Sequence, residues 1–241
     1  MHSIRIISFD FMMNFCRNST SCKQCNHNCL CDLENDIEEE ELKNNISEIS
    51  LKLGDTVLKQ DSFVSQVAFL KEGIVKKVLE GRNEKNVILN ILEPGQFIAL
   101  PELIKAARYP FSLVALSDCK VCFINRDWLT KVGLLNRRWC EFMMSMTATN
   151  YAFIYQQLAT NSTRNNYGKL ASTILYLTGP GFKNDVMNLL SRKELAELAI
   201  SSKESVNKIL QQLHHDGIIK LDKHRITLLR RDLLEKLSTL G

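Results

Sequence analysis

The sequence is poor in residues that interrupt regular structure. Its 241 residues include only four prolines and ten glycines, which argues against long disordered stretches. It also lacks a glycine-rich phosphate loop, a dinucleotide-binding fingerprint and a Cys/His/Asp set suited to nucleophilic catalysis. We therefore predict a compactly folded protein that is not an enzyme.

A long uncharged apolar run is also lacking. Arg5 and Asp10 interrupt the apolar stretch MHSIRIISFDFMMNF, and this stretch lacks the layout of a secretory signal. We therefore predict no membrane partner and a cytoplasmic location. Because thiols are kept reduced in the cytoplasm, a tight cluster of cysteines is expected to bind metal or to sense redox state.

The middle of the chain alternates between apolar and polar residues. Residues 49–125 carry short apolar runs with a period near two, separated by the turn sequences LGD, KEG, EGRNEK and EPGQ. This pattern predicts a small sandwich, barrel or roll. From Asn136 the period changes to three or four, which predicts one long helix.

The predicted helix has a wide apolar surface. One stripe contains Trp139, Met143, Met146, Asn150 and Phe153, and an adjoining stripe contains Phe142, Ile154 and Leu158. We expect this surface to pack on the strand domain and to offer a stripe to a second copy of the chain, with Asn150 setting the register of that seam. The alternative is an ordinary core helix of a monomer.

The C-terminal stretch predicts a winged helix-turn-helix. Ser191 and Glu194 form a capping box at the start of a short helix, and Ser202 caps a second helix after a break at residues 200–201. Four apolar residues share one face of the second helix, namely Val206, Ile209, Leu210 and Leu213. The short strands IIKL and RITLL follow.

The second helix carries five candidate DNA contacts, which are Ser202, Lys203, Glu204, Asn207 and Lys208. Lysine donates to guanine, glutamate accepts from cytosine and asparagine pairs with adenine, while a helix N-terminus favours phosphate. The alternative is that Glu204 closes a capping box with Ser201 and that the lysines are only solvated.

These features together resemble the Crp/Fnr superfamily of bacterial transcription regulators, across residues 46–240. The resemblance implies an α+β fold in four parts. These are an N-terminal segment with the cysteines and an acidic stretch (1–45), a cyclic-nucleotide-binding-like β-roll as sensor domain (46–135), a dimerisation helix (136–163) and a winged helix-turn-helix (164–241). It also implies that a homodimer binds double-stranded promoter DNA and contacts RNA polymerase. The operator is then expected to be palindromic, with half-sites about 34 Å apart.

The segment SSKESVNKIL resembles the recognition helix of that family. Lys203 and Lys208 stand where arginine is common, and lysine lacks the bidentate guanidinium fork. Ile200 stands where many members have a glycine in the turn, so Ile200 is costly if its φ is positive.

Cyclic-nucleotide-binding members carry a Gly-Glu pair for ribose and an Arg-Ser or Arg-Thr pair for the cyclic phosphate. This chain has residues 100–102 (LPE) at the first position and Tyr109, Pro110, Phe111 and Ser112 at the second. Because the phosphate arginine is missing, a buried phosphate would be poorly compensated, and we expect no cyclic nucleotide. Arg108 is the nearest cation in the sequence.

The cysteines resemble those of the Fnr branch, which places CxxC, five residues and a third Cys before the roll and takes a fourth Cys from a strand of the roll. Cys22, Cys25, Cys31 and Cys122 match this pattern. The resemblance implies that they ligate a [4Fe-4S] cluster and that the protein senses oxygen or redox state through it. Cluster integrity would then control dimerisation and promoter binding.

Several alternatives remain open at this point. Cys29 is an alternative to Cys31, because it gives the spacing CxxCxxxC, and Cys119 is an alternative to Cys122. Cys16 and Cys140 are two further thiols that are available. Because Cys119 and Cys122 differ by an odd number of positions in a strand, only one of them should face a cluster. Four cysteines also suit structural zinc, a thiol redox switch or no role.

Two other classes of function remain open. The first is a regulator of the same type that responds to haem, nitric oxide or another small ligand, with His27 as a metal ligand beside the cysteines. An iron-sulfur or dithiol oxidoreductase that uses the CxxC pair is the other.

Overall fold

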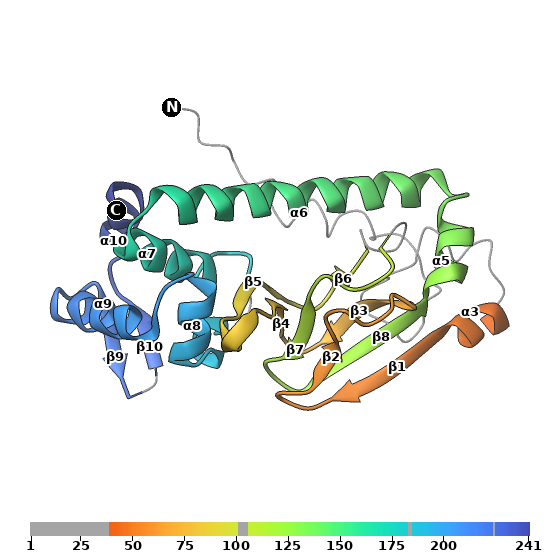
Figure 1. The fold of residues 1–241 in the computed structure, drawn as a ribbon, viewed down its shortest axis with the longest axis horizontal. Helices are drawn as coiled ribbons and strands as arrows, with labels where there is room; N and C mark the ends of the chain where they lie inside the picture. The colour runs from red at the N-terminus through yellow and green to blue at the C-terminus, as the bar shows by residue number, and fades with distance from the viewer. Residues whose placement is uncertain (1–38, 101–105, 183–184, 224) are drawn as a thin grey trace.

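A computed structural model describes residues 39–100, 106–182, 185–223 and 225–241 (Figure 1). A β-roll, one long helix and a helical C-terminal domain follow one another along the chain. This arrangement confirms the predicted α+β class.

The β-roll consists of two antiparallel four-stranded sheets, ordered β1-β8-β3-β6 and β2-β7-β4-β5. The strands are β1 (Ile46–Leu51), β2 (Thr56–Leu58), β3 (Gln66–Glu72), β4 (Val75–Leu79), β5 (Val87–Leu92), β6 (Phe97–Ile98), β7 (Ser112–Ala115) and β8 (Cys119–Asn125). A short helix, α3 (Glu39–Asn45), precedes them, and a 3-10 turn, η1 (Arg82–Glu84), lies between β4 and β5. Three of the predicted turns place a glycine at positive φ, and these glycines are Gly54 at +90°, Gly73 at +89° and Gly95 at +93°.

Two apolar clusters lie on opposite faces of the sheet that contains β8. The first fills the space between the two sheets and includes Leu70, Leu113 and Val121. The second lies on the outer face of that sheet, under α5 (Arg126–Gly133) and the first turns of α6 (Arg137–Thr163). The two faces of β8 therefore meet different surroundings.

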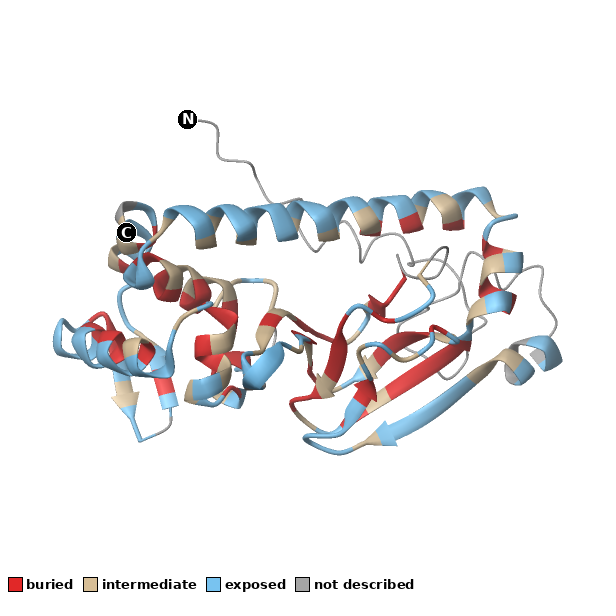
Figure 2. Cartoon of the chain, in the orientation of Figure 1, coloured by how far each residue is buried: buried red, intermediate tan, exposed pale blue. Residues whose placement is uncertain are grey.

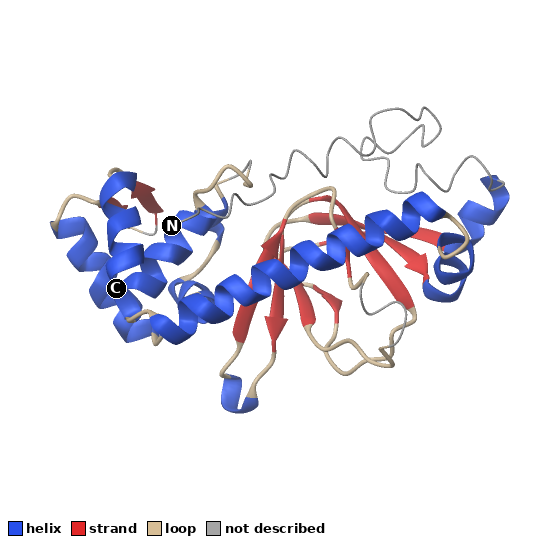
Figure 3. Ribbon diagram, turned by 90° about the horizontal axis from the view of Figure 1, so that it is seen from above, coloured by secondary structure: helices blue, strands red, loops and turns tan. Residues whose placement is uncertain are grey.

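The long helix α6 begins where the sequence predicts, because the Asn136 side chain caps it by accepting a hydrogen bond from the backbone N–H of Trp139. Figure 3 shows α6 crossing the roll and reaching the C-terminal domain. Trp139, Met143 and Met146 are buried against the outer cluster of the roll.

The predicted position of Asn150 in the seam between two copies is corrected. Asn150 is half-buried and lies on the stripe that continues from Met146 towards Phe153, whose ring contacts Tyr176 of the same chain at 5.4 Å between centroids. This stripe therefore faces the chain itself. The opposite side of α6 is exposed along most of its length (Figure 2).

The C-terminal domain packs around an apolar core shared by its helices. It contains α7 (Asn166–Leu177), a 3-10 turn η2 (Val186–Leu189), α8 (Arg192–Leu198), α9 (Lys203–His215), β9 (Ile219–Asp222), β10 (Arg225–Leu228) and α10 (Arg231–Leu240). None of the described helices is both long and apolar enough to cross a membrane.

Candidate nucleic-acid interface and sulfur site

The predicted capping box at the start of α8 is confirmed. The Ser191 hydroxyl accepts a hydrogen bond from the backbone N–H of Glu194 (3.2 Å), and a carboxylate oxygen of Glu194 accepts one from the backbone N–H of Ser191 (2.7 Å). This reciprocal pair satisfies two backbone donors that a helix N-terminus leaves free. It fixes where the first helix of the helix-turn-helix begins.

The turn between α8 and α9 places Ile200 in the left-handed region, with φ +46°. The backbone N–H of Ser201 closes the turn by donating to the carbonyl of Ala196 (3.0 Å). A β-branched residue is strained in this conformation. The expectation that isoleucine is costly at this position is therefore supported by its backbone geometry.

The second helix, α9, presents two different faces. The Ser202 hydroxyl caps it by accepting a hydrogen bond from the backbone N–H of Ser205 (3.1 Å). Because the cap is Ser202, the proposed capping box between Ser201 and Glu204 is not formed. The four predicted apolar residues are all buried, and they are Val206, Ile209, Leu210 and Leu213.

The four polar candidates of α9 share the opposite face. Lys203, Glu204, Asn207 and Lys208 are all exposed. They extend from the N-terminal end of the helix, where a recognition helix contacts base edges. The geometry thus presents donors and an acceptor to an approaching duplex.

Three further basic residues lie in the elements next to α9 in the chain, and the sequence analysis did not single them out. Arg192 is half-buried at the start of α8, and burial lowers the pKa of its guanidinium. Lys220 of β9 and Lys223 at the tip of the β9–β10 hairpin are exposed. They belong to the first helix and the hairpin of the helix-turn-helix domain, so their place in the motif is the signal that could have drawn attention to them.

The exposed side of α6 carries a second apolar stripe. Its members recur with alternating steps of four and three residues, and they are Met144, Ala148, Tyr151, Tyr155, Leu158 and Ser162. This is the seven-residue repeat of a coiled-coil seam. Of the residues predicted for such a seam, Leu158 belongs to this stripe and Ile154 is exposed beside it.

Cys122 and Cys119 point to opposite faces of the roll, as predicted. Cys122 lies in the outer cluster with Trp128 and Trp139 and is 8% exposed. Cys119 lies in the cluster between the two sheets, where its thiol donates to the carbonyl of Ser117 (3.1 Å). Burial raises the pKa of the Cys119 thiol.

The other proposed sulfur ligands, Cys22, Cys25 and Cys31, lie outside the described residues, as do Cys16 and Cys29. Within the described ranges no group of three or more His, Cys, Asp or Glu side chains gathers as metal ligands.

Cys140 lies in the first turn of α6. Its thiol donates to the carbonyls of Gly133 and Leu134 at 3.6 and 3.7 Å.

The segment expected to carry the phosphate pair of cyclic-nucleotide-binding members packs into the interior of the roll. Tyr109 and Phe111 are each 3% exposed, and the Tyr109 hydroxyl donates to the carbonyl of Gln66 (2.5 Å). Arg108 is exposed outside the roll, with its guanidinium 4.2 Å from the centroid of the Phe63 ring. Arg108 is therefore poorly placed to replace the missing phosphate arginine.

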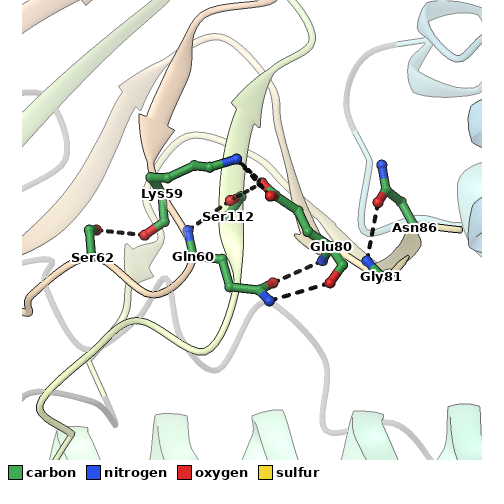
Figure 4. A network of polar contacts seen from close by, with 7 residues as sticks. All are labelled: Lys59, Gln60, Ser62, Glu80, Gly81, Asn86 and Ser112. Carbon is green, nitrogen blue, oxygen red and sulfur yellow. Dashed lines mark hydrogen bonds and ion pairs between the residues drawn. The ribbon is translucent and has the colours of Figure 1, made fainter. Parts of the chain in front are cut away.

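The fully buried Ser112 belongs to a polar network at one end of the roll (Figure 4). Its hydroxyl donates to the Glu80 carboxylate and accepts a hydrogen bond from the backbone N–H of Gln60. Lys59 donates to both oxygens of Glu80, at 2.7 and 2.6 Å. The hydrogen bonds from Lys59 and then Ser112 lower the pKa of Glu80. The Ser112 hydroxyl is thus already engaged within the protein.

Comparison with known proteins agrees with this architecture. Residues 48–133 match the cyclic nucleotide-binding domain family, and residues 168–237 match the Crp-like helix-turn-helix domain family. The Anaerobic regulatory protein of Bacillus subtilis is 24% identical over 176 residues, which cover 70% of this chain and 74% of that protein. The Transcriptional regulatory protein btr of Bordetella pertussis is 22% identical over 186 residues, covering 75% of this chain and 76% of that protein.

Solved structures share the fold. FixK2 from Bradyrhizobium japonicum superposes with a TM-score of 0.68 at 18% identity, covering 80% of this chain and 96% of that one. A Crp/Fnr-family transcriptional regulator from Thermus thermophilus gives a TM-score of 0.65 at 19% identity, covering 80% and 98%. Members of this family bind promoter DNA and act as dimers. Because the chain carries both of these domains, it is a transcription regulator of the Crp/Fnr family.

Proposed function

We propose that this regulator senses oxygen or redox state through a [4Fe-4S] cluster held by Cys22, Cys25, Cys31 and Cys122. The observation that carries the proposal is the direction of Cys122, which leaves the interior of the roll and lies under α5 and α6. The sulfur spacing before the roll and the name of the relative from Bacillus subtilis, an anaerobic regulatory protein, agree with it.

Cys122 is suited to hold one corner of a cluster because its backbone is rigid. It lies in β8, which pairs with β1 on one side and with β3 on the other, so Cys122 faces Glu48 and Phe69 in the two registers. Soft thiolate ligands suit iron-sulfur chemistry. Cys122 would hold such a cluster together with Cys22, Cys25 and Cys31, and the cluster would supply oxygen-sensitive redox chemistry. Binding of a cluster would restrain the position of the Cys122 side chain.

The neighbours of Cys122 connect it to the dimer surface. Trp139 and Met143, in the first turns of α6, belong to the same apolar cluster as Cys122. The exposed heptad stripe starts one residue later, at Met144. A change in packing around Cys122 therefore acts on the end of α6 from which the stripe begins.

On the DNA side, we infer that Lys203, Glu204 and Asn207 read base edges and that Lys208 and the Ser202 end of α9 contact phosphates. Transcription activation additionally requires a surface that contacts RNA polymerase. We also infer that no cyclic nucleotide acts as effector, because the side chains of Tyr109 and Phe111 fill the roll interior.

Anaerobic purification of the full chain tests the cofactor. We expect a brown protein that contains iron and acid-labile sulfide, whereas zinc alone would refute the iron-sulfur assignment. Cys122→Ser is expected to remove iron, and the matched variant Cys119→Ser is expected to retain it. Loss of iron from Cys29→Ser but not from Cys31→Ser would reassign the third ligand.

A gel shift with promoter DNA tests the sensing function. Protein kept anaerobic is expected to bind more tightly than the same preparation exposed to air, while iron content and absorbance are followed in parallel. Equal binding before and after loss of the iron absorbance would contradict control by the cluster.

A further inference from the structure

The C-terminal domain, from α7 to α10, is called the DNA-reading domain from here on. It packs directly on the roll and is also joined to the roll by α6. In Figure 1, α8 lies beside β4 and β5. One apolar cluster combines buried residues of the roll with buried residues of α7, α8 and α9, and the contributions of the roll are Ile74, Val78, Ile88, Ile91 and Leu116. The position of the reading domain is therefore set partly by the sheet of β4 and β5.

A partly buried ion pair crosses this boundary. Lys76 of β4 places its ammonium nitrogen 2.5 Å from a carboxylate oxygen of Glu194 in α8, and the two side chains are only 15% and 19% exposed. By contrast, the pair between Lys120 and Glu72 within the roll is 43% and 59% exposed. Exposed pairs contribute little, whereas charge-assisted hydrogen bonds shielded from water are stronger.

The same carboxylate is built into the start of α8. Its other oxygen accepts the capping hydrogen bond from the backbone N–H of Ser191. Burial acts to raise the pKa of Glu194, but the hydrogen bonds from Lys76 and Ser191 outweigh it, so the pKa is lowered and Glu194 is charged. Lys76 thus holds the first turn of the helix-turn-helix through a group that is already fixed within α8.

A second polar contact joins the reading domain to β5. The Tyr176 hydroxyl of α7 accepts from the backbone N–H of Ile91 (3.2 Å) and donates to its carbonyl (3.4 Å). β5 is at the edge of its sheet, so these backbone groups have no strand partner on that side. The Lys76–Glu194 pair and the Tyr176 contact fix α8 and α7 separately.

This docked position leaves the DNA-reading face open, because Lys203, Glu204, Asn207 and Lys208 remain exposed. We propose that Lys76 and Glu194 are positioning residues that fix the direction in which each DNA-reading domain projects, and thereby set the half-site spacing that a dimer recognises. The inference depends on DNA binding by a dimer and is independent of the iron-sulfur proposal.

The physical basis is preorganisation. When two reading domains are held rigidly in a dimer, binding of the first half-site presents the second at high effective concentration. If the domains are loose, the dimer must lose that freedom on binding both half-sites. A single half-site demands no fixed distance, so its affinity is insensitive to how firmly each domain is held.

The test uses full-length Lys76→Gln and Glu194→Gln, with Lys120→Gln as the matched exposed control. Glutamine in place of Glu194 can still complete the capping box, so α8 keeps its N-terminus. The probes are the duplex that the wild-type protein selects from a random-sequence pool, the same duplex with one base pair inserted or deleted between half-sites, and a duplex with one half-site.

Each glutamine variant is expected to bind the selected duplex roughly tenfold more weakly. A tenfold loss of affinity corresponds to the removal of about one charge-assisted hydrogen bond. The penalty for a one-base-pair change in spacing should shrink, half-site affinity should stay within about twofold, and Lys120→Gln should match wild type. The double variant should bind like either single variant, because both remove one shared interaction.

Lys76→Arg, which keeps the charge, should bind like wild type. Equal losses on the half-site and the full duplex would overturn the proposal, since they would indicate damage to the reading face itself. An unchanged dependence on spacing would overturn it as well. A variant that loses its fold is revealed by circular dichroism, and the milder Lys76→Gln then decides the question on its own.

Discussion

The exposed stripe of α6 makes a quantitative prediction for dimerisation. Leu158 is 63% exposed and lies in the heptad stripe with Tyr155 and Tyr151. If two copies of α6 pack along this stripe, Leu158 is buried against its partner. Truncation to alanine should therefore weaken the dimer while leaving the monomer fold intact, since little of the side chain is buried in one chain.

The size of the effect follows from the exposed area. Full burial of a leucine contributes about 1.5–3 kcal/mol, so covering the exposed part of Leu158 contributes about 1–2 kcal/mol in each copy. A two-fold axis places the change in both protomers, which gives about 2–4 kcal/mol per dimer. The dimer dissociation constant of Leu158→Ala should then rise by roughly thirtyfold to several hundredfold.

Sedimentation equilibrium of wild type and variants under the same anaerobic conditions measures this constant. Leu135→Ala is the matched control, because Leu135 is 86% exposed but lies in the α5–α6 turn, outside the heptad stripe. It should leave the constant unchanged. An equal effect of both substitutions, or no effect of Leu158→Ala, would refute a seam along this stripe.

Three further predictions test other parts of the molecule. Lys208→Ala should weaken binding to all DNA sequences alike and reduce the slope of log K against log salt concentration by about one. Fluorescence anisotropy across salt concentrations measures this slope, and an unchanged slope excludes a phosphate contact. Gly73→Ala should lower the melting temperature far more than Gly54→Ala, since both have positive φ but a Cβ at Gly73 would lie 2.3 Å from a backbone oxygen, while Gly54 has open space. Tyr176→Phe, which keeps the ring, should lose about 1 kcal/mol of unfolding free energy in urea titration because the bonds to Ile91 are removed.

Much of the DNA-reading domain could be predicted because its determinants are local. The capping pair Ser191 and Glu194 is three residues apart, and the buried face of α9 follows helical spacing. For Ile200 the resemblance gave only a conditional expectation, a cost if its φ is positive, and its φ is +46°. Likewise, period-two alternation alone placed Cys119 and Cys122 on opposite faces of β8.

The features that were missed depend on residues far apart in the sequence. Two apolar stripes run along α6, and long-range packing such as that of Trp139 against Phe97, at 5.3 Å between ring centroids, decides which stripe faces the roll. Asn150 was assigned to the seam because the inward stripe was also regular. The ion pair of Lys76 with Glu194 joins residues 118 positions apart, and no local pattern marks it.

The packing of α6 ties these separate features together. Its first turns share a cluster with Cys122, its exposed side carries the heptad stripe, and Phe153 in its second half contacts Tyr176 of the reading domain. The reading domain is meanwhile held to the roll by Lys76. The reading domain is thus attached both to α6, through Phe153 and Tyr176, and to the roll, through Lys76 and Glu194. Because packed interfaces resist continuous deformation, a shift of α6 relative to the roll must break one of these two contacts. If a cluster at Cys122 shifts α6 as proposed, the shift would reach α9 by moving the reading domain between discrete positions.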